Sequence, residues 1–238
     1  MGAGIVHDSV ASDEYAECRL KAKFLTGLPS EFDLFETMHA TREQGCRHLD
    51  LHLQRLRTSA AYFGFPFEEA RLRNMLMETC ATLPPGAHRV RLALDQSGAC
   101  KVNSAPLVPL PNPVKVLIAH QPTDSSDLFL RHKTTVRERY DEAWRAAEAQ
   151  GAFDMLFCNT QGELTEGARS NVFVKLHGRW YTPPLAAGLL PGVMRTVLLA
   201  DPAWSAMERH LTLDDLRVAE EVVVCNALRG ALRATVVF

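Results

Sequence analysis

Residues 162–174 read GELTEGARSNVFV, and this stretch combines a turn, two carboxylates and the start of an apolar strand. Gly162 supplies the turn, because glycine lacks the Cβ that restricts other residues in tight turns. Glu163 and Glu166 follow it before the apolar run begins. By itself the pattern is typical of a hairpin turn with solvated carboxylates. Whether Glu166 instead lies in a functional site depends on what stands upstream.

A lysine stands 33 positions before Glu166: Lys133, in the stretch FLRHKTT of residues 129–135. The segment before it, 123–131, has polar turn-forming residues and no apolar period, which indicates a connection between two domains. A side chain that follows such a connection can enter a cleft between domains, where small molecules bind. A lysine considered alone is more often solvated, so the neighbouring motifs decide between these interpretations.

Two further motifs could bind an anion. In GLLPGVMR a proline precedes Gly192 and Val193 at the start of an expected helix, where backbone N–H groups are available to a phosphate. In VVVCNALRG an apolar strand runs into a loop of small residues, with Asn226 and Ala227 at the strand end. Each motif is common in proteins when it occurs alone.

In this order the four pieces resemble the class IV aminotransferase family of pyridoxal-phosphate enzymes, and the spacing from Lys133 to Glu166 fits that family. Residues 48–65, HLDLHLQRLRTSAAYFGF, resemble the early helix in which an arginine binds the cofactor phosphate; that position here is Arg55. The resemblance runs from about Phe32 to the C-terminus. It implies an α/β (α+β) fold of two domains with the cofactor between them.

The resemblance also implies a role for each residue around pyridoxal 5'-phosphate. Lys133 holds the cofactor aldehyde and later acts as the proton-transfer base, and Glu166 pairs with the pyridine nitrogen. His132 either tunes Lys133 or shapes its loop. The residues expected to hold the phosphate are Arg55, Gly192, Val193, Asn226 and Ala227.

Within the family, the wording HKTT, LTEGARSN, TPPL, GLLPGVMR and CNALRG is similar to aminodeoxychorismate lyase domains fused behind the chorismate-utilising subunit of 4-aminobenzoate synthase. Such lyases convert 4-amino-4-deoxychorismate to 4-aminobenzoate and pyruvate in folate synthesis. Residues 1–27 resemble the end of the upstream subunit, which is therefore a possible partner. Two alternatives remain open: a transaminase of branched-chain or D-amino acids, and an inactive scaffolding domain of a chorismate enzyme.

Substrate recognition is less well marked in the sequence. Thr37, in LFETM, matches a family strand that lines the active-site cleft, but His39 stands where relatives commonly have an arginine. Arg169 and Arg229 are candidates for binding substrate carboxylates, and a structural role is an equal alternative for each. Tyr140 either approaches the cofactor or packs in the core.

The composition of the 238 residues narrows the class of protein. A hydrophobic content of 47% is ample for a buried core, and 26 basic against 28 acidic residues give no field for nucleic acid. The sequence shows no signal peptide and no apolar run of membrane length, so we expect a cytoplasmic protein with a small-molecule substrate. The resemblance adds an expected homodimer. No metal site or disulfide is predicted from the scattered cysteines, which are Cys18, Cys46, Cys80, Cys100, Cys158 and Cys225.

Apolar periodicity gives the expected elements of each half. The tail, 1–27, should contain a loop and a short helix. The N-terminal domain, 28–122, should contain strands at 31–38, 88–95, 100–105 and 114–120, mainly antiparallel, and helices at 48–65 and 66–82. The C-terminal cofactor-binding domain, 132–238, should contain helices at 136–150 and after Pro191, and strands at 154–159, 171–178, 179–183 and 220–226.

Overall fold

Alternating burial along two neighbouring strands builds the first sheet of the protein. In the computed structural model, which describes residues 31–238, β1 (Leu34–Thr41) and β3 (His88–Leu94) pair antiparallel. The short β2 (Gly45–Cys46) and β4 (Cys100–Pro106) complete the order β2-β1-β3-β4, and every pairing is antiparallel. The predicted strands 31–38, 88–95 and 100–105 are therefore confirmed. The expectations for residues 1–27 lie outside the described residues.

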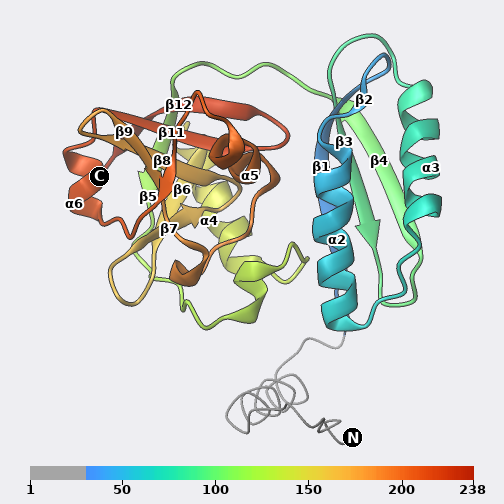
Figure 1. The fold of residues 1–238 in the computed structure, drawn as a ribbon, viewed down its shortest axis with the longest axis horizontal. Helices are drawn as coiled ribbons and strands as arrows, with labels where there is room; N and C mark the ends of the chain where they lie inside the picture. Colours follow the sequence, from blue (N-terminus) through green and yellow to red (C-terminus); the bar gives the residue numbers. More distant parts are fainter. Residues whose placement is uncertain (1–30) are drawn as a thin grey trace, which may run out of the picture. The chain divides into compact units, whose positions relative to one another are not determined.

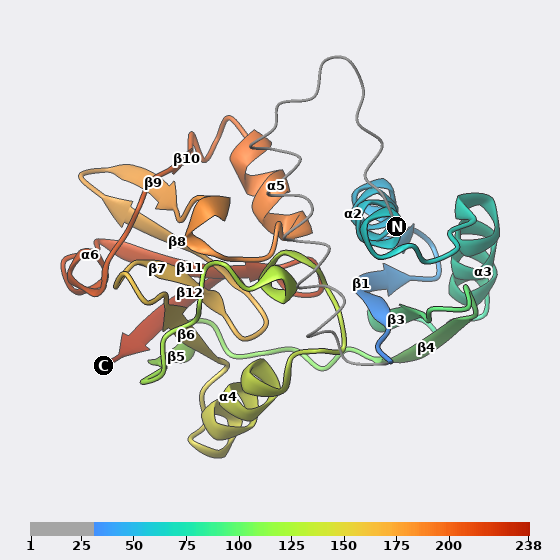
Figure 2. The same ribbon diagram turned by 90° about the horizontal axis from the view of Figure 1, so that it is seen from below.

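Two helices cover one face of this sheet, as Figures 1 and 2 show. Helix α2 (Leu49–Phe63) buries Leu53, Leu56 and Ala60, whose spacing places them on one side of the helix. It ends at Gly64, which has the left-handed backbone (φ 75°) that only glycine adopts without strain. Helix α3 (Glu69–Ala81) begins three residues after Pro66, so the second predicted helix is confirmed but starts later than expected.

The second sheet has eight strands in the order β10-β9-β8-β11-β12-β5-β6-β7, and β7 also pairs with β8. This extra pairing makes a closed circuit of six strands, from β8 through β11, β12, β5, β6 and β7 back to β8. The circuit places the beginning of β8 beside β7. The strands are β5 (Val114–Ile118), β6 (Asp154–Cys158), β7 (Leu164–Gly167), β8 (Asn171–Leu176), β9 (Arg179–Thr182), β10 (Met207–Glu208), β11 (Glu221–Asn226) and β12 (Gly230–Val237).

The central strands β8 and β11 are buried on both faces, which explains their continuous apolar sequences. Val172 and Val224 belong to the larger core of the sheet, whereas Phe173 and Val223 pack in a separate cluster with Leu198 of α5. Helices α5 and α4 lie on opposite sides of this sheet (Figure 2). The helical segments are α4 (Glu138–Ala149), α5 (Val193–Ala200), α6 (Leu213–Arg217) and the 3₁₀ turns η1 (Leu128–Arg131) and η2 (Leu185–Ala187).

Five strands differ from expectation, and two of them, β2 and β10, are two-residue strands that were not predicted. Residues 114–118, assigned above to the N-terminal domain, form β5 of the second sheet, where they pair in parallel with β12 and β6. The chain therefore passes from the first sheet to the second before β5, and the expected connector at 123–131 lies beyond that passage. Strand β12 was not predicted, although its residues alternate between partly buried and exposed. Residues 164–167 were expected to belong to a hairpin turn with solvated carboxylates. They form strand β7 instead, and all four are buried.

No helix among the described residues is both long and apolar enough to cross a membrane. Over the same residues, no group of three or more His, Cys, Asp or Glu side chains is placed to hold a metal ion. Five of the cysteines are free thiols, and the Sγ atoms of Cys46 and Cys80 lie 3.5 Å apart.

Candidate active site

A cavity of about 500 Å³ lies among β1, β3, the segment 123–141, β7 and the starts of α5 and of the loop after β11. This volume is in the usual range for sites that bind small molecules. We call it the Lys133 pocket. The predicted residues that line it are Thr37, Arg55, Lys133, Glu166, Arg169, Gly192, Val193, Asn226 and Ala227. The structure does not bring Arg229 into the pocket lining.

Backbone pairing with β1 fixes the position of Lys133. The carbonyl of Lys133 accepts a 3.0 Å hydrogen bond from the N–H of Phe35, and the N–H of Thr135 donates to the carbonyl of Asp33 at 2.9 Å. Leu34 and Thr134 form an antiparallel bridge between these bonds. Lys133 thus lies on a short extended segment beside the first sheet, and its Nζ is 4.7 Å from the centre of the Phe35 ring.

The surroundings of Lys133 favour the uncharged amine. Burial lowers the pKa of Lys133 most, the positive charges of Arg55 and Arg137 lower it as well, and Glu36 and Glu166 oppose them, so that the pKa is about 7. The Lys133 amine is therefore unprotonated in a large fraction of the molecules near neutral pH. An unprotonated lysine amine is a nucleophile and a base, which are the two properties expected of this residue.

His132 anchors the lysine segment to helix α2. Its Nδ1 lies 2.9 Å from the hydroxyl of Ser59, and its ring is 4.7 Å from the Tyr62 ring and 4.8 Å from the Phe63 ring. Burial lowers the pKa of His132 to about 4, with a smaller contribution from Arg131. His132 is therefore neutral at physiological pH and adds no charge beside Lys133.

Glu166 lies on β7 with only 4% of its surface exposed, opposite Asn171 of β8. The Tyr140 hydroxyl donates to its Oε1 at 3.0 Å and the Asn171 amide to its Oε2 at 3.1 Å. Burial raises the pKa of Glu166 to about 8, against the opposing effects of the Leu190 backbone, Tyr140 and Lys133. A cationic group opposite this carboxyl would favour its ionised form.

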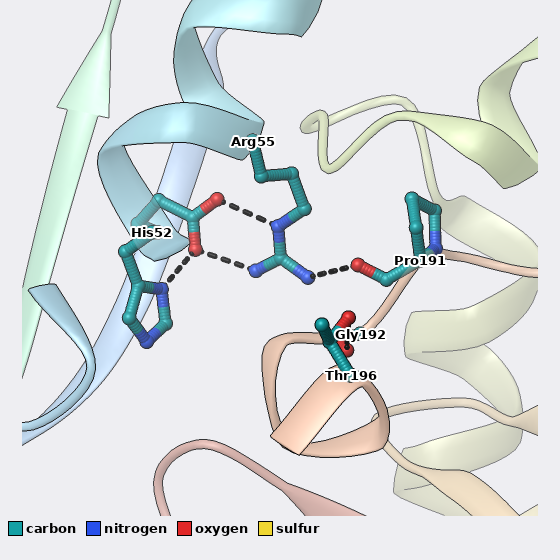
Figure 3. Close-up of polar contacts among 6 residues, drawn as sticks. His52, Arg55, Pro191, Gly192 and Thr196 are labelled. Atoms are coloured by element: carbon teal, nitrogen blue, oxygen red, sulfur yellow. Dashed lines mark hydrogen bonds and ion pairs between the residues drawn. The ribbon is translucent and has the colours of Figure 1, made fainter. Parts of the chain in front are cut away.

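Arg55 joins the first sheet to the start of α5 (Figure 3). Its Nη1 donates to the carbonyl of Pro191 at 3.1 Å, and its Nε and Nη2 donate to Glu36 at 2.8 and 2.5 Å. Glu36 also lies 2.6 Å from Nδ1 of His52. Burial alone would raise the pKa of Glu36, but Arg55 and His52 lower it to about 2. The ionised carboxylate therefore holds the guanidinium beside the loop before α5.

Gly192 is the N-cap residue of α5 and has no room for a side chain. A Cβ built there would collide with the side-chain oxygen of Asn171, although the backbone of Gly192 (φ −67°) is ordinary for any residue. Its carbonyl accepts bonds from the N–H and hydroxyl of Thr196 at 2.9 and 3.2 Å (Figure 3). The first N–H groups of a helix lack partners within the helix, so this bare start of α5 can accept an anion next to Arg55.

The loop after β11 forms another part of the pocket wall. The amide of Asn226 donates to the carbonyl of Arg169 at 3.0 Å, and its oxygen accepts from the N–H of Arg229 at 2.8 Å. Both ends of this side chain are thus used to shape the loop. The backbone of Asn226 and Ala227, more than the Asn226 side chain, is what the loop offers to a ligand.

The two arginines considered for substrate binding have structural partners. Arg169 donates through Nε to the carbonyl of Phe153 at 2.9 Å, and its guanidinium lies 4.3 Å from the Phe153 ring and 5.0 Å from the Trp144 ring. Arg229 donates to the carbonyl of Val108 at 2.5 Å. Thr37 lines the pocket, and Tyr140, which was weighed as a core residue, lines it too.

Several pocket residues were not singled out from the sequence. Arg89 and Arg91 of β3 line the pocket, as do Phe35 and Arg137. Arg137 donates to Asp141 at 2.8 Å and to the carbonyl of Ala168 at 2.7 Å. The alternation in HRVRLALD could have indicated the two β3 arginines, because it places them on the face opposite the buried valine and leucines.

Known proteins resemble this chain in sequence and in fold. A model of the family described as Amino-transferase class IV matches residues 33–237. A Schizosaccharomyces pombe protein named "Putative aminodeoxychorismate lyase" is 32% identical over 213 residues, which cover 87% of this chain and 90% of that protein.

Solved structures show the same fold. The structure of a protein named "Putative amino-acid aminotransferase", from Mesorhizobium loti, is 35% identical with a TM-score of 0.80, covering 87% of this chain and 100% of that chain. A hypothetical aminotransferase from Mycobacterium tuberculosis, solved in a PLP-bound form, has a TM-score of 0.75 at 23% identity, covering 86% of this chain and 81% of that chain. The protein described here belongs to the class IV aminotransferase family and has its α/β fold.

Proposed function

We propose that this protein is a pyridoxal-phosphate-dependent aminodeoxychorismate lyase, which converts 4-amino-4-deoxychorismate to 4-aminobenzoate and pyruvate. The observation that carries the proposal is the meeting of Lys133 and Glu166 in one pocket, with pKa values of about 7 and about 8. The similarity to the Schizosaccharomyces pombe protein, over nearly the whole length of both chains, favours the lyase within the family.

The donor set of the pocket fits this cofactor. Lys133 offers an amine that is partly unprotonated at neutral pH, and Glu166 offers a buried carboxyl that is mostly neutral until a cation faces it. Arg55 and the bare helix start at Gly192 offer donors for a phosphate dianion. When bound, pyridoxal phosphate supplies an electron-accepting ring next to the reacting carbon of the substrate. Val193 and the Asn226–Ala227 loop complete the proposed phosphate end.

The remaining steps belong to the protein's own residues. Lys133 would hold the cofactor aldehyde, and its free amine would accept the proton from the substrate ring carbon that bears the nitrogen. Glu166, which Tyr140 and Asn171 hold in place, would pair with the pyridine nitrogen and favour its protonated form. Loss of the ring proton would allow the ring C–O bond to the enolpyruvyl group to break, and the enolate released would become pyruvate by taking up the proton that Lys133 had accepted. Formation of the aromatic product would favour the step.

Chemical trapping tests the cofactor and the lysine without any assay of activity. Borohydride treatment of protein saturated with pyridoxal phosphate should fix the cofactor irreversibly to one peptide, the one that contains Lys133. Lys133→Ala should abolish this label, whereas Lys115→Ala, which removes an exposed lysine from β5, should leave it intact. A label on another peptide would contradict the assignment.

The reaction itself is tested with aminodeoxychorismate and no keto-acid acceptor. Release of pyruvate under these conditions supports the lyase. Incubation with an amino acid alone tests the second candidate, a class IV transaminase, which the similarity to the Mesorhizobium loti protein favours. Conversion of the cofactor to its pyridoxamine form would support that second function. A protein that binds no cofactor would support the third hypothesis, an inactive scaffolding domain.

The assembly is also a proposal. One face of the first sheet is covered by α2 and α3, while Lys101, Asn103 and Arg89 on β3 and β4 are exposed. We expect a second copy of the chain to pack near this surface and form a homodimer. Sedimentation analysis of the purified protein measures this directly. Co-purification with a chorismate-utilising synthase subunit would test the other expected partner.

A further inference from the structure

Asp154, at the start of β6, is a fully buried carboxylate that the proposed reaction does not use. Its Oδ1 accepts from the N–H of Met155 at 2.9 Å, and its Oδ2 accepts from the hydroxyl of Ser170 at 2.5 Å and from the N–H of Arg169 at 3.2 Å. Burial raises the pKa of Asp154, and these bonds oppose the rise. Two of the three donors belong to residues 168–170, which we call the β7–β8 turn.

The backbone on both sides of Asp154 holds the same turn. The N–H of Ala168 donates to the carbonyl of Met155 at 3.1 Å, and Nε of Arg169 donates to the carbonyl of Phe153 at 2.9 Å. Buried polar groups of a turn need partners of this kind. The start of β6 therefore supplies acceptors to every residue of the β7–β8 turn, and Asp154 supplies the side-chain acceptor among them.

Gly167 shows how closely the carboxylate approaches the chain before the turn. A Cβ built at Gly167 would collide with Oδ2 of Asp154 and would lie 2.8 Å from the hydroxyl oxygen of Ser170. Asp154 thus occupies the space into which any other residue at position 167 would extend its side chain. The carboxylate and the turn are in direct contact.

The β7–β8 turn belongs to the wall of the Lys133 pocket. Gly167, Ala168, Arg169 and Ser170 line the pocket, whereas Asp154 does not. The carboxylate therefore supports this part of the wall from behind, and a change at Asp154 can reach the pocket only through the residues that it holds.

The turn also connects the two residues proposed to serve the ring nitrogen of the cofactor. Glu166 stands before the turn and Asn171 after it, opposite one another in the pairing of β7 with β8. The amide of Asn171 donates to Oε2 of Glu166 at 3.1 Å and to the carbonyl of Leu190 at 3.0 Å. Because only residues 167–170 connect the two, a displaced turn would change how Glu166 faces the pocket.

We propose that Asp154 is a positioning residue for the cofactor: it holds the β7–β8 turn so that Glu166 faces the pyridine nitrogen. This inference rests on the proposed function and deepens it. Asp154 acts through Ser170 and Arg169, since it does not line the pocket itself. Its loss should weaken the contact with the ring nitrogen and spare the phosphate end, because the proposed phosphate donors belong to α2, to the start of α5 and to the loop after β11.

The test compares pyridoxal phosphate with 1-deazapyridoxal phosphate, in which a C–H group replaces the ring nitrogen. Both compounds carry the same aldehyde and phosphate, so the ratio of their affinities reports on the nitrogen. Equilibrium dialysis against the purified chain, stripped of cofactor, measures each affinity at neutral pH. The native protein should prefer pyridoxal phosphate by at least about tenfold, because the analogue forfeits a hydrogen bond to a charged group.

Two variants disturb the support of the turn. Asp154→Asn keeps the size of the side chain, but in either orientation its NH2 group faces a backbone N–H, that of Met155 or that of Arg169. Ser170→Ala removes only the hydroxyl and leaves the carboxylate with its two backbone donors, so it provides the test if Asp154→Asn does not fold.

Asp95→Asn is the matched control. Asp95 holds the turn between β3 and β4 in the same manner, since its Oδ1 accepts from the N–H of Ser97 at 2.8 Å and from the N–H of Ala99 at 3.0 Å. Asp95 does not line the Lys133 pocket either. Asp95→Asn therefore measures what the loss of a turn-holding aspartate does away from the proposed cofactor.

Asp154→Asn should lower the affinity ratio roughly two- to tenfold, the range for loss of one hydrogen bond, and Ser170→Ala should lower it in the same direction. Asp95→Asn should leave the ratio near native. Equal loss of affinity for both compounds, or an equal fall of the ratio in Asp95→Asn, would overturn the inference and leave the proposed function standing. A native protein that binds no pyridoxal phosphate would contradict the proposed function itself, and the inference with it.

Discussion

The guanidinium of Arg55 is held by two hydrogen bonds to the buried carboxylate of Glu36, at 2.8 Å from Nε and 2.5 Å from Nη2. A third donor of the same group reaches the carbonyl of Pro191, in a part of the chain 136 residues away. Glu36 therefore orients an arginine that belongs to the first sheet's helix toward the start of α5. The Glu36–Arg55 pair links the two sheets at the phosphate end of the proposed site.

Glu36→Gln should destabilise the protein by about 3–5 kcal/mol at neutral pH, because breaking a buried ion pair leaves one charge uncompensated. The folded-state pKa of Glu36, about 2, is below its ordinary value of 4.5. The stability from this pair is therefore present above pH 4.5 and is lost as the pH falls toward 2. Urea unfolding at pH 7 and pH 3 should show a smaller difference between variant and native protein at the lower pH. The exposed Glu78→Gln on α3 should stay within about 0.5 kcal/mol of native.

Glu166→Gln should have opposite effects on the cofactor-free and cofactor-bound protein. Without cofactor, the folded-state pKa of Glu166 is about 8, above its ordinary value of 4.5. The native protein's stability from the neutral carboxyl is fully present below pH 4.5 and is lost as the pH rises through 8. Glutamine cannot ionise, so the variant should gain stability relative to native across this window, by up to several kcal/mol. Chemical unfolding at a series of pH values measures the difference.

With the cofactor bound, the same substitution should cripple the reaction, because glutamine cannot hold a proton on the pyridine nitrogen by charge. Pyruvate release should fall by at least about tenfold. A stability difference that stays flat from pH 5 to pH 8 would contradict the raised pKa of Glu166. Full activity of the variant would instead contradict the role proposed for its charge.

Local patterns predicted much of this fold. Helices α2 and α3 follow from apolar residues at helical spacing, and the strands β1, β3, β8 and β11 follow from alternation or from continuous apolar runs. Such local patterns do not predict contacts between segments that are distant in the sequence. Strand β5 pairs in parallel with β12, more than a hundred residues later, and either strand alone gives no indication of its partner.

In the site, too, the sequence predicted side chains with a recognisable chemistry but did not predict the backbone contacts that position them. Motifs identified Lys133, Glu166 and Arg55, and the structure places all three in one pocket. The pairing of Lys133 with Phe35 uses only backbone atoms, which leave no trace in residue type. Glu36 could have been found, because a carboxylate in the buried alternation of a strand requires a partner.

Ser59→Ala tests whether His132 anchors the lysine segment. The substitution removes the hydroxyl that lies 2.9 Å from His132 Nδ1, and it leaves that buried nitrogen without its partner. We expect a loss of about 1–3 kcal/mol of stability and weaker retention of the cofactor at Lys133. Thr58→Ala is the matched control on the same helix, because its exposed hydroxyl bonds only to the Gln54 carbonyl. Thermal unfolding and cofactor dialysis should distinguish the two variants. Identical behaviour would contradict the claim that His132 anchors the segment that contains Lys133.

Gly192→Ala tests whether space, and not backbone conformation, requires glycine at the start of α5. The φ of −67° suits alanine, but the added Cβ collides with the Asn171 side chain, which also holds Glu166. We expect a loss of about 1–3 kcal/mol of stability from overpacking and weaker binding of pyridoxal phosphate, measured by equilibrium dialysis.

Asn171→Ala removes the colliding side chain, so the Gly192→Ala effect should nearly vanish in that background. Asn171→Ala alone carries its own cost, since its amide bonds to Glu166 and to the carbonyl of Leu190 are lost. The two substitutions should therefore be strongly non-additive, as expected for side chains in direct contact. If the two losses simply added, the collision would not be the reason for the glycine. A contact other than the one with Asn171 would then explain why glycine is required at the start of α5.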